Sequence, residues 1–359
     1  MTRSAGAALA RDISAPTFAV SVGGTPLPVA LASQVNRICV DEDVGLPSMF
    51  ALELAAGDAT RETSFIDGGQ FAVGTEVEVK FGYGNALQTL MAGEITSIET
   101  EFKRGTAPSL VVRGHDRRHR LLRGRKTRSF VQQKDSDIAV ILGGEAGLDV
   151  KAEDSQVRHE YVLQANQNNL EFLQERARHI AYEIVIEAQT LHFRPLQSFQ
   201  AEVLTLTFED DLLEFSPRLS AMGQLTEVEV RGWSPKDKQE IVANARAGDE
   251  VSTMGGQQSG AVLAQRAFSD AICTLSDRPV ASQAEADQRA RAYFNRAVLG
   301  LVCAEGSCSG RADLRPGQVI KVDGIGTRFS GQYYVTATQH RYCPRRAYET
   351  RFVVRRNAA

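Results

Sequence analysis

Phe71-Ala-Val-Gly74, Val77-Glu-Val-Lys-Phe81 and the turn Gly82-Tyr-Gly84 follow one another in a pattern that returns near the other end of the chain. The later copy reads Leu314-Arg-Pro-Gly317, Val319-Ile-Lys-Val322 and Gly324-Ile-Gly326. Both copies place short apolar runs between glycines, which is typical of β-strands joined by tight turns. The sequence therefore predicts one β-unit that is built twice.

Four glycines hold matching positions in the two copies. Gly74 and Gly93 in the first correspond to Gly317 and Gly331 in the second, and we interpret all four as structural turns. Glycine is expected where a Cβ atom is excluded or where φ is positive. The copies close with strands at 109–113 and 349–354. Two similar β-units can be arranged around an axis, as in a component of a ring or tube.

Composition indicates a large globular protein with a balanced charge. The chain has 359 residues, 43% of them hydrophobic, which suffices for two or three domains. Its 41 Lys and Arg residues against 44 Asp and Glu give a net charge of -3, which does not favour bulk binding of nucleic acid or membranes. No run approaches the roughly 18 apolar residues of a membrane helix. Arg11 and Asp12 interrupt the Ala-rich N-terminus, which argues against a secretory signal and for assembly in the cytoplasm.

Strand patterns dominate, and helical patterns occupy a few segments. A hairpin is expected over 16–34 and two further strands over 35–54, whereas capping residues indicate helices over 135–142, 168–180 and 282–297. The fold class is therefore mainly β with an α/β insertion (α+β). The expected divisions are an N-terminal extension (1–15), a first β-domain (16–129), an α/β insertion (130–197) and a second β-domain (198–356) with a loop at 245–260 and the helix at 282–297.

The cysteines do not indicate a disulfide framework or a metal site. There are five, an odd number at irregular spacing. Cys303 and Cys308 flank what we interpret as a hairpin tip and are expected to be reduced. Cys343 near His340 is too little for a zinc site, which needs two more ligands. We expect no metal and no cofactor.

No residue pattern indicates catalysis. The serines lack the Gly-x-Ser-x-Gly elbow, and the Gly-x-Gly pairs precede no helix that could hold a phosphate. His115 and Asp116 are adjacent on a strand and cannot relay a proton, and His179 is expected to be a solvated histidine on a helix. The acidic runs 41–43 and 209–211 could supply paired carboxylates, although neighbouring acids in loops are usually solvated. We therefore expect no enzyme.

One charged run, residues 113–128, holds eight basic residues and a single acid, Asp116. It could bind nucleic acid, but it lacks interleaved aromatic residues for stacking on bases. We prefer a contact with an acidic surface of a partner subunit. The interface candidates are Arg117, Arg118, Arg120, Arg123, Arg125, Lys126 and Arg128.

Three motifs in order resemble phage late control D proteins, the hub proteins of contractile tails that are related to the hub portion of VgrG. The first is Gly114-His-Asp116 with Arg120-Leu121 and Arg123-Gly-Arg-Lys-Thr-Arg-Ser-Phe130. The second is Val162-Leu-Gln-Ala-Asn-Gln-Asn-Asn-Leu-Glu-Phe-Leu-Gln-Glu-Arg-Ala177. The third is Leu314-Arg-Pro-Gly-Gln318 with Phe329-Ser-Gly-Gln-Tyr-Tyr-Val335 and His340. The resemblance covers roughly residues 16–356 and is closest to hubs of extracellular contractile injection systems and tailocins.

The resemblance implies a structural function. Such hubs are homotrimers in which each subunit contributes two tube-like β-barrels, so that a pseudo-six-fold ring joins a hexameric inner tube to a trimeric spike. The implied partners are the inner tube protein, a spike protein or spike domain, and other baseplate proteins. The implied location is a tail or an injection particle after cytoplasmic assembly. The spike would be a separate protein or would follow on a longer chain.

Two alternatives from other functional classes remain open at this point. A tail-associated peptidoglycan hydrolase would need a carboxylate or Cys/His site in a cleft. A nucleic-acid-binding adaptor would use the basic run 113–128.

Overall fold

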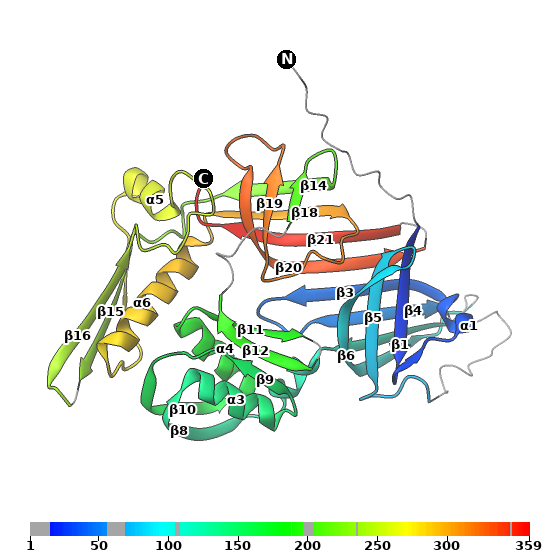
Figure 1. Cartoon of the computed structure of the whole chain (residues 1–359), viewed down its shortest axis with the longest axis horizontal. Coiled ribbons are helices and arrows are strands. Elements are labelled where there is room, and N and C mark those ends of the chain that lie inside the picture. The colour runs from blue at the N-terminus through cyan, green and yellow to red at the C-terminus, as the bar shows by residue number, and fades with distance from the viewer. Residues whose placement is uncertain are drawn as a thin grey trace, which may run out of the picture.

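The computed structural model describes residues 15–55, 69–104, 108–187, 189–196, 204–234, 236–344 and 347–359 (Figure 1). Residues 1–14 of the expected N-terminal extension lie outside these ranges. Strands predominate over helices in the described chain, which confirms a mainly β, α+β fold.

The first unit is an antiparallel sheet that curls around its own core. Its strands lie in the order β3-β4-β7-β6-β5-β1-β2. Side chains such as Ile38, Phe50 and Phe81 fill the core and are fully buried. Its elements are β1 (Pro16–Val22), β2 (Thr25–Pro26), α1 (Val29–Ala32), β3 (Val35–Asp43), β4 (Met49–Ala55), β5 (Glu76–Tyr83), β6 (Ala86–Glu101), β7 (Ser109–His115) and the 3₁₀ helix η1 (Arg117–Leu122).

The second unit has the same strand order, as the repeated sequence pattern predicts. Its order β14-β18-β21-β20-β19-β13 matches β3-β4-β7-β6-β5-β1 strand for strand. One difference is that β13 pairs in parallel with β19, whereas β1 is antiparallel to β5. The strands are β13 (Leu204–Thr207), β14 (Leu212–Leu219), β18 (Val302–Ser309), β19 (Val319–Asp323), β20 (Gly331–Cys343) and β21 (Ala347–Arg356).

Hydrogen bonds define which residues of the two units correspond. Gly74 N donates to Ile95 O at 2.8 Å, and Gly317 N donates to Val335 O at 2.9 Å. In return, Ile95 N donates to Thr75 O and Val335 N donates to Gln318 O, both at 2.9 Å. Ile95 is therefore the counterpart of Val335.

Register shifts occur at corresponding places in the two units. They lie between Ile95 and Ser97 in β6 and between Val335 and Ala337 in β20. A second pair lies between Val35 and Arg37 in β3 and between Leu212 and Glu214 in β14. Such irregularities bend a strand and increase its twist, so the two units are bent at the same positions.

The interpretation of Gly93 as a turn and its match with Gly331 need correction, although a Cβ is excluded at Gly93 as expected. Gly74 and Gly317 do occupy equivalent turns, with φ of +90° and +85°. Gly93, by contrast, lies inside β6, where a Cβ would come within 2.4 Å of the His115 carbonyl oxygen. With Ile95 equivalent to Val335, Gly93 corresponds to Tyr333 and not to Gly331, so the glycine match was two residues out of register.

The two units form one continuous sheet because β20 pairs with β3. This antiparallel joint runs from Ala337 opposite Asp43 to Tyr342 opposite Ile38. Figure 1 shows β3 and β20 side by side at the boundary between the units. Among the described residues no closed barrel is present, since β3 pairs with β20 instead of with β1 or β2.

The α/β insertion between the units has a core of its own, and its two expected helices are confirmed. Asn168 Oδ1 accepts from Glu171 N at 2.8 Å and the Glu171 side chain accepts from Asn168 N, as the capping pattern predicts. Phe130 stacks on Phe172 inside the core. The elements are β8 (Lys126–Lys134), α3 (Asp135–Glu145), β9 (Asp149–Ala152), β10 (Arg158–Gln167), α4 (Asn169–His179), β11 (Tyr182–Glu187) and β12 (Thr190–Pro195).

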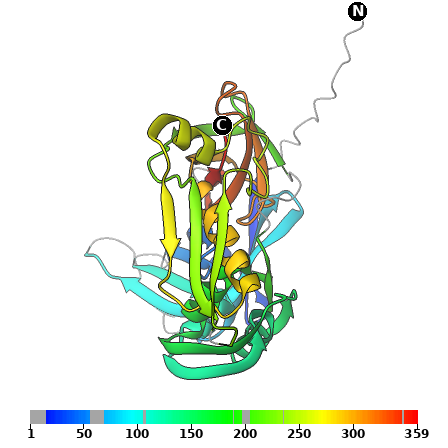
Figure 2. The same ribbon diagram turned by 90° about the vertical axis from the view of Figure 1, so that its left-hand side faces the viewer.

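A third sheet interrupts the second unit between β14 and β18. The helix expected over 282–297 packs on this sheet and shares a separate core with it (Figure 2). The nine-residue helix α5 was not expected, since the predicted loop ended at its first residue and no helix was predicted after it. Ser259 caps this helix. The elements are β15 (Glu227–Ser234), β16 (Gln239–Arg246), α5 (Gly260–Phe268), β17 (Ile272–Leu275) and α6 (Gln283–Val298).

A buried ionic cluster holds the two units together at their joint. The Arg315 guanidinium of the second unit contacts the Glu42 carboxylate in β3 and the Leu90 carbonyl in β6. Thr338 Oγ1 donates to Glu42 Oε2 at 3.3 Å, and His340 Nε2 lies 3.6 Å from the same oxygen. Burial alone would raise the pKa of Glu42, but Arg315 and His340 lower it below its usual value.

We predict that Glu42→Gln destabilises the protein by about 1–3 kcal/mol at neutral pH, because Arg315 loses its carboxylate in a largely buried site. A lowered pKa in the folded state means that the stabilisation is complete above pH 4.5 and is lost as the pH falls further. The measurement is denaturant unfolding from neutral to acidic pH. The control is Glu53→Gln, which removes a more exposed pair with Arg37. Equal stability of the Glu42 variant and wild type at pH 7 would contradict the prediction.

A second ionic cluster joins the insertion to α6. His159 lies between Asp135, with Nε2 to Oδ2 at 3.2 Å, and Glu285, with Nδ1 to Oε1 at 3.4 Å. Burial by itself would lower the pKa of His159, but these two carboxylates raise it to about 9. A raised histidine pKa stabilises the folded state below pH 6.5, and this stabilisation is lost as the pH rises to about 9.

We therefore predict that Glu285→Gln lowers the melting temperature at pH 6.5 and that the difference from wild type shrinks towards pH 9 and above. The amide still accepts the hydrogen bond from Ala281 N, so the change removes mainly the charge. Melting curves between pH 6 and 10 test this. Asp287→Asn, on the same helix, is the control. A constant difference across the whole pH range would rule out the His159 contribution.

Candidate functional site

The polar face of the joined sheet is the strongest candidate site, and strand register creates it. Alternate residues of a strand point to the same side, so side chains in register form rows across the sheet. One row crosses seven strands: Glu214, Ser307, Arg351, Gln339, Asp41, Met49 and His115. A second row contains Ser216, Glu305, Val353, Ala337 and Asp43. We call this surface the groove face.

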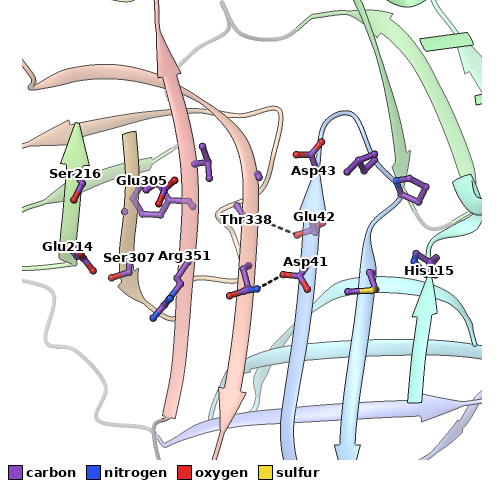
Figure 3. A pocket seen from close by; sticks show the side chains of 18 residues that line it. Asp41, Glu42, Asp43, His115, Glu214, Ser216, Glu305, Ser307, Thr338 and Arg351 are labelled. Carbon is purple, nitrogen blue, oxygen red and sulfur yellow. Dashed lines mark hydrogen bonds between the residues drawn. The ribbon is translucent and has the colours of Figure 1, made fainter. Parts of the chain in front are cut away.

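The groove face is hollowed into a cavity of about 520 Å³ that crosses the joint between the units (Figure 3). Four carboxylates and one guanidinium of this face line it, those of Asp41, Asp43, Glu214, Glu305 and Arg351, and the buried Glu42 also borders it. Gln339 Nε2 donates to Asp41 Oδ1 at 2.6 Å across the joint. The excess of carboxylates makes the groove anionic, so it attracts basic surfaces and repels phosphates.

The acidic run 41–43 is divided between two faces of β3. Asp41 and Asp43 line the groove, whereas Glu42 is in phase with Ile38 and Val40 and is buried. Nothing in the described residues brings three or more His, Cys, Asp or Glu side chains together as a metal site. The arrangement is suited to electrostatic contact with a macromolecule.

Three of the predicted interface residues lie inside the protein or are anchored within it, which corrects their interpretation. Arg117 and Arg118 are 9% and 6% exposed, and Arg120 pairs with the buried Glu94. Arg118 donates from Nη2 to Asp116 Oδ2 at 2.7 Å and to Ser48 Oγ at 2.9 Å. These arginines hold η1 against the first unit, because buried charges are stable only when they are paired.

The other interface candidates are more exposed, and most are paired within the chain. Arg125 lies 3.2 Å from Glu171, and Lys126 and Arg128 both contact Glu145. Hydrogen bonds from Arg128 and Lys126 lower the pKa of Glu145 to about 2. In the part of the chain that the structure describes, Arg123 has no ionic partner. The basic run therefore offers a partner less charge than its sequence suggests.

The histidine and cysteine expectations are partly overturned. His179 is half-buried and not a fully solvated surface histidine: burial lowers its pKa to about 4, and it lines a small charged cavity beside His159 and Arg176. His115 Nδ1 bonds to Thr96 Oγ1 at 2.8 Å, not to Asp116. Cys303 and Cys308 lie in one strand, β18, and not at a hairpin tip.

Sequence reasoning missed the groove face and the cluster at the joint. The sequence of β3 contained a signal for the cluster: Glu42 follows Ile38 and Val40 at alternate positions, so it points to the same buried side of the strand. His340 similarly lies in phase with the buried Thr338 and is itself fully buried. The rows of the groove face depend on strand neighbours that are far apart in the chain, so no local pattern reveals them.

Comparison with solved structures shows a shared fold. A 43 kDa tail protein of prophage MuSo2 from Shewanella oneidensis has a TM-score of 0.69 and 11% identity, with 95% of this chain and 98% of that chain covered. A tail protein from Neisseria meningitidis has a TM-score of 0.67 and 14% identity, with 95% and 96% covered. An Escherichia coli component of the type VI secretion system has a TM-score of 0.61 and 16% identity, with 94% and 77% covered.

Comparison at the level of sequence identifies a family. No curated protein matches the chain significantly. The family model described as the Alg8 N-terminal domain matches residues 12–343, which is most of the sequence. The chain belongs to the Alg8 N-terminal domain family.

Proposed function

We propose that this chain is the structural hub of a baseplate in a contractile injection machine. In this role three copies join a hexameric inner tube to a trimeric spike and perform no catalysis. The observation that carries the proposal is the repeated unit, with the same strand order and register shifts at the same positions. Proteins of similar fold are described as phage tail proteins and as a type VI secretion component, which supports a place in such a particle.

The repeat gives a physical account of symmetry adaptation. Each copy supplies two wall segments of nearly equal curvature, so three copies supply six, which match a hexamer. The insertion and the third sheet are different structures, and they occur once per copy. A surface built from them has true three-fold symmetry and suits a trimeric spike. We propose that the units form tube-like barrels only when three copies are assembled into this ring.

The two alternative functions have less support. A nucleic-acid adaptor would rely on the basic run, but Glu76, Glu94, Glu145 and Glu171 neutralise much of it inside the chain. The anionic groove also repels phosphate. A peptidoglycan hydrolase finds no support in the tail proteins that share the fold, and turnover of peptidoglycan by the purified chain would contradict our proposal.

The proposed partners are a second and third copy, the inner tube protein, a spike protein or spike domain, and neighbouring baseplate proteins. We propose assembly in the cytoplasm followed by incorporation into the tail or injection particle. Among the described helices, none has both the length and the hydropathy to cross a membrane.

The first test of this proposal is the oligomeric state. We predict a trimer by light scattering, with an interface on the order of 2,000 Å² per contact. Folding and assembly are then linked, so the melting temperature should fall on about a hundred-fold dilution. A monomer whose melting temperature does not depend on concentration would contradict the hub.

The second test addresses the exposed part of the basic run. We predict that reversing Arg123, Arg125 and Lys126 to Glu leaves the chain folded, because exposed ion pairs contribute only about 0–1 kcal/mol each. Assembly, measured by light scattering and by co-purification with the tube protein, should be impaired.

The matched control reverses three exposed basic residues of the third-sheet region, Lys236, Lys238 and Arg266, and should assemble normally. Unimpaired assembly of the Arg123 triple variant, together with lost binding to DNA, would favour the nucleic-acid adaptor instead.

A further inference from the structure

Among the strand edges of the joined sheet that have no partner within the described chain, two belong to β14 and to the outer half of β6. β14 pairs with β18 on one side and forms the end of the sheet. In β6, residues 86–94 pair with β5, but residues 97–101 have only β7 as a neighbour. Figure 2 shows the cyan hairpin of β6 and β7 projecting from the body of the molecule. Open edges are templates for pairing with another chain.

These two edges are the counterparts of the strands that already form the joint between the units. The hydrogen bonds that equate Ile95 with Val335 make residues 97–102 correspond to 337–342 of β20. The strand pairings extend this correspondence from β6 through β7 and β4 to β3 in the first unit, and from β20 through β21 and β18 to β14 in the second. Residues 38–43 of β3 therefore correspond to residues 215–220. The pairing of β20 with β3 therefore has a vacant equivalent in which β6 would meet β14.

We propose that residues 97–102 of one copy pair antiparallel with residues 215–220 of a second copy, with Glu99 opposite Arg218. The register is that of the internal joint, where Gln339 is opposite Asp41 and Tyr342 is opposite Ile38. The inference rests on the proposed function, because it specifies how the copies of the hub are joined.

The side chains brought together by this register are complementary. On the groove face, Glu99 meets Arg218, which is exposed and has no ionic partner among the described residues. Glu99 already accepts from Arg113 Nε at 2.9 Å and can bridge two guanidinium groups. At the proposed joint, the attraction between Glu99 and Arg218 occupies the position that the hydrogen bond from Gln339 to Asp41 has at the internal joint.

On the core face, the same register brings apolar groups together. Ile98 meets Leu219, and Phe102 meets Phe215. Ile98, Leu219 and Phe102 are 37%, 38% and 63% exposed in the isolated chain. Pairing would cover apolar surface that a monomer leaves in water.

Pro217 lies opposite Thr100 and limits the pairing. Ser220 N donates to Leu301 O at 2.9 Å on the β18 side, so the nitrogen of Pro217 faces the open edge. Proline has no N–H, and it is tolerated at an edge of this kind. The intermolecular ladder lacks one hydrogen bond there, and the flanking side chains determine the specificity of the contact.

The contact is head-to-tail, since each copy offers β6 to one neighbour and β14 to the other. A head-to-tail contact gives a closed ring or an open filament, depending on its rotation. Internal and intermolecular joints would then alternate around the ring, and every unit would have the same kind of neighbour.

Cysteine cross-linking in the full-length protein tests this register. Val44 N donates to Thr336 O, so Gln339 and Asp41, three residues further along, form a non-hydrogen-bonded pair, the type with the closest side chains. Their counterparts are Glu99 and Arg218. Cys303, which is exposed and lies opposite Arg218 on β18, is first replaced by Ser so that it cannot compete for the new disulfide. In this background, oxidation of Glu99→Cys/Arg218→Cys should give covalent dimers and trimers, whereas each single variant should not. The register control is Glu99→Cys/Ser216→Cys, two residues away on the same face, which should cross-link far less.

Charge exchange gives a second readout that needs no cysteine. Arg218→Glu should weaken self-association by about ten-fold or more through repulsion from Glu99. The double variant Glu99→Arg/Arg218→Glu should recover most of the loss.

The outcomes separate the inference from the proposed function. A wild-type trimer whose Glu99/Arg218 cysteine pair fails to cross-link, or links no better than the Glu99/Ser216 pair, overturns this joint and leaves the hub standing. A wild-type chain that stays monomeric at every concentration overturns both.

Discussion

The pairing of β20 with β3 is the interaction on which the remaining architecture depends. It joins two units that are distant in sequence, since Ala337 lies opposite Asp43. Because β3 is used in this way, the first unit stays open and its core depends on a neighbouring unit for one edge. The same pairing aligns the side-chain rows of seven strands and so creates the groove face. One set of backbone hydrogen bonds therefore determines both the joint and the candidate site.

Charge in this protein serves two separate purposes. Inside, Glu42 with Arg315 joins the two units, Asp116 with Arg118 anchors η1 on Ser48, and Asp135 with His159 joins α3 to β10 within the insertion. Buried charges of this kind are costly unless each is paired, so they favour one geometry of contact. On the groove face, acidic side chains outnumber basic ones and give the cavity an excess of negative charge. The long basic segment is thus largely structural, while the candidate site is acidic.

In the function that we propose, the repeated unit lets one chain meet both six-fold and three-fold neighbours. Corresponding irregularities in β3 and β14, and in β6 and β20, give the two walls the same bends. The insertion and the third sheet have their own cores, so they can differ without disturbing those walls. This division is consistent with the low sequence identity to tail proteins of similar fold, since strand order and curvature can persist while individual residues change.

The sequence by itself determined the repeat, the mainly β class, the helices predicted over 135–142 and 168–180, and the turns at Gly74 and Gly317, because these depend on local periodicity, capping and backbone conformation. Only the tertiary structure decided that Gly93 lies within a strand, that Arg117 and Arg118 are buried, and that the helix at 283–298 belongs to a separate core. The physical reason is that burial and charge pairing depend on neighbours that lie tens of residues away, as for Arg117 and Glu76, or hundreds, as for Glu42 and Arg315. A run of arginines reads the same in a sequence whether its carboxylates lie on a partner or, as for Glu76 and Glu94, elsewhere in the same chain.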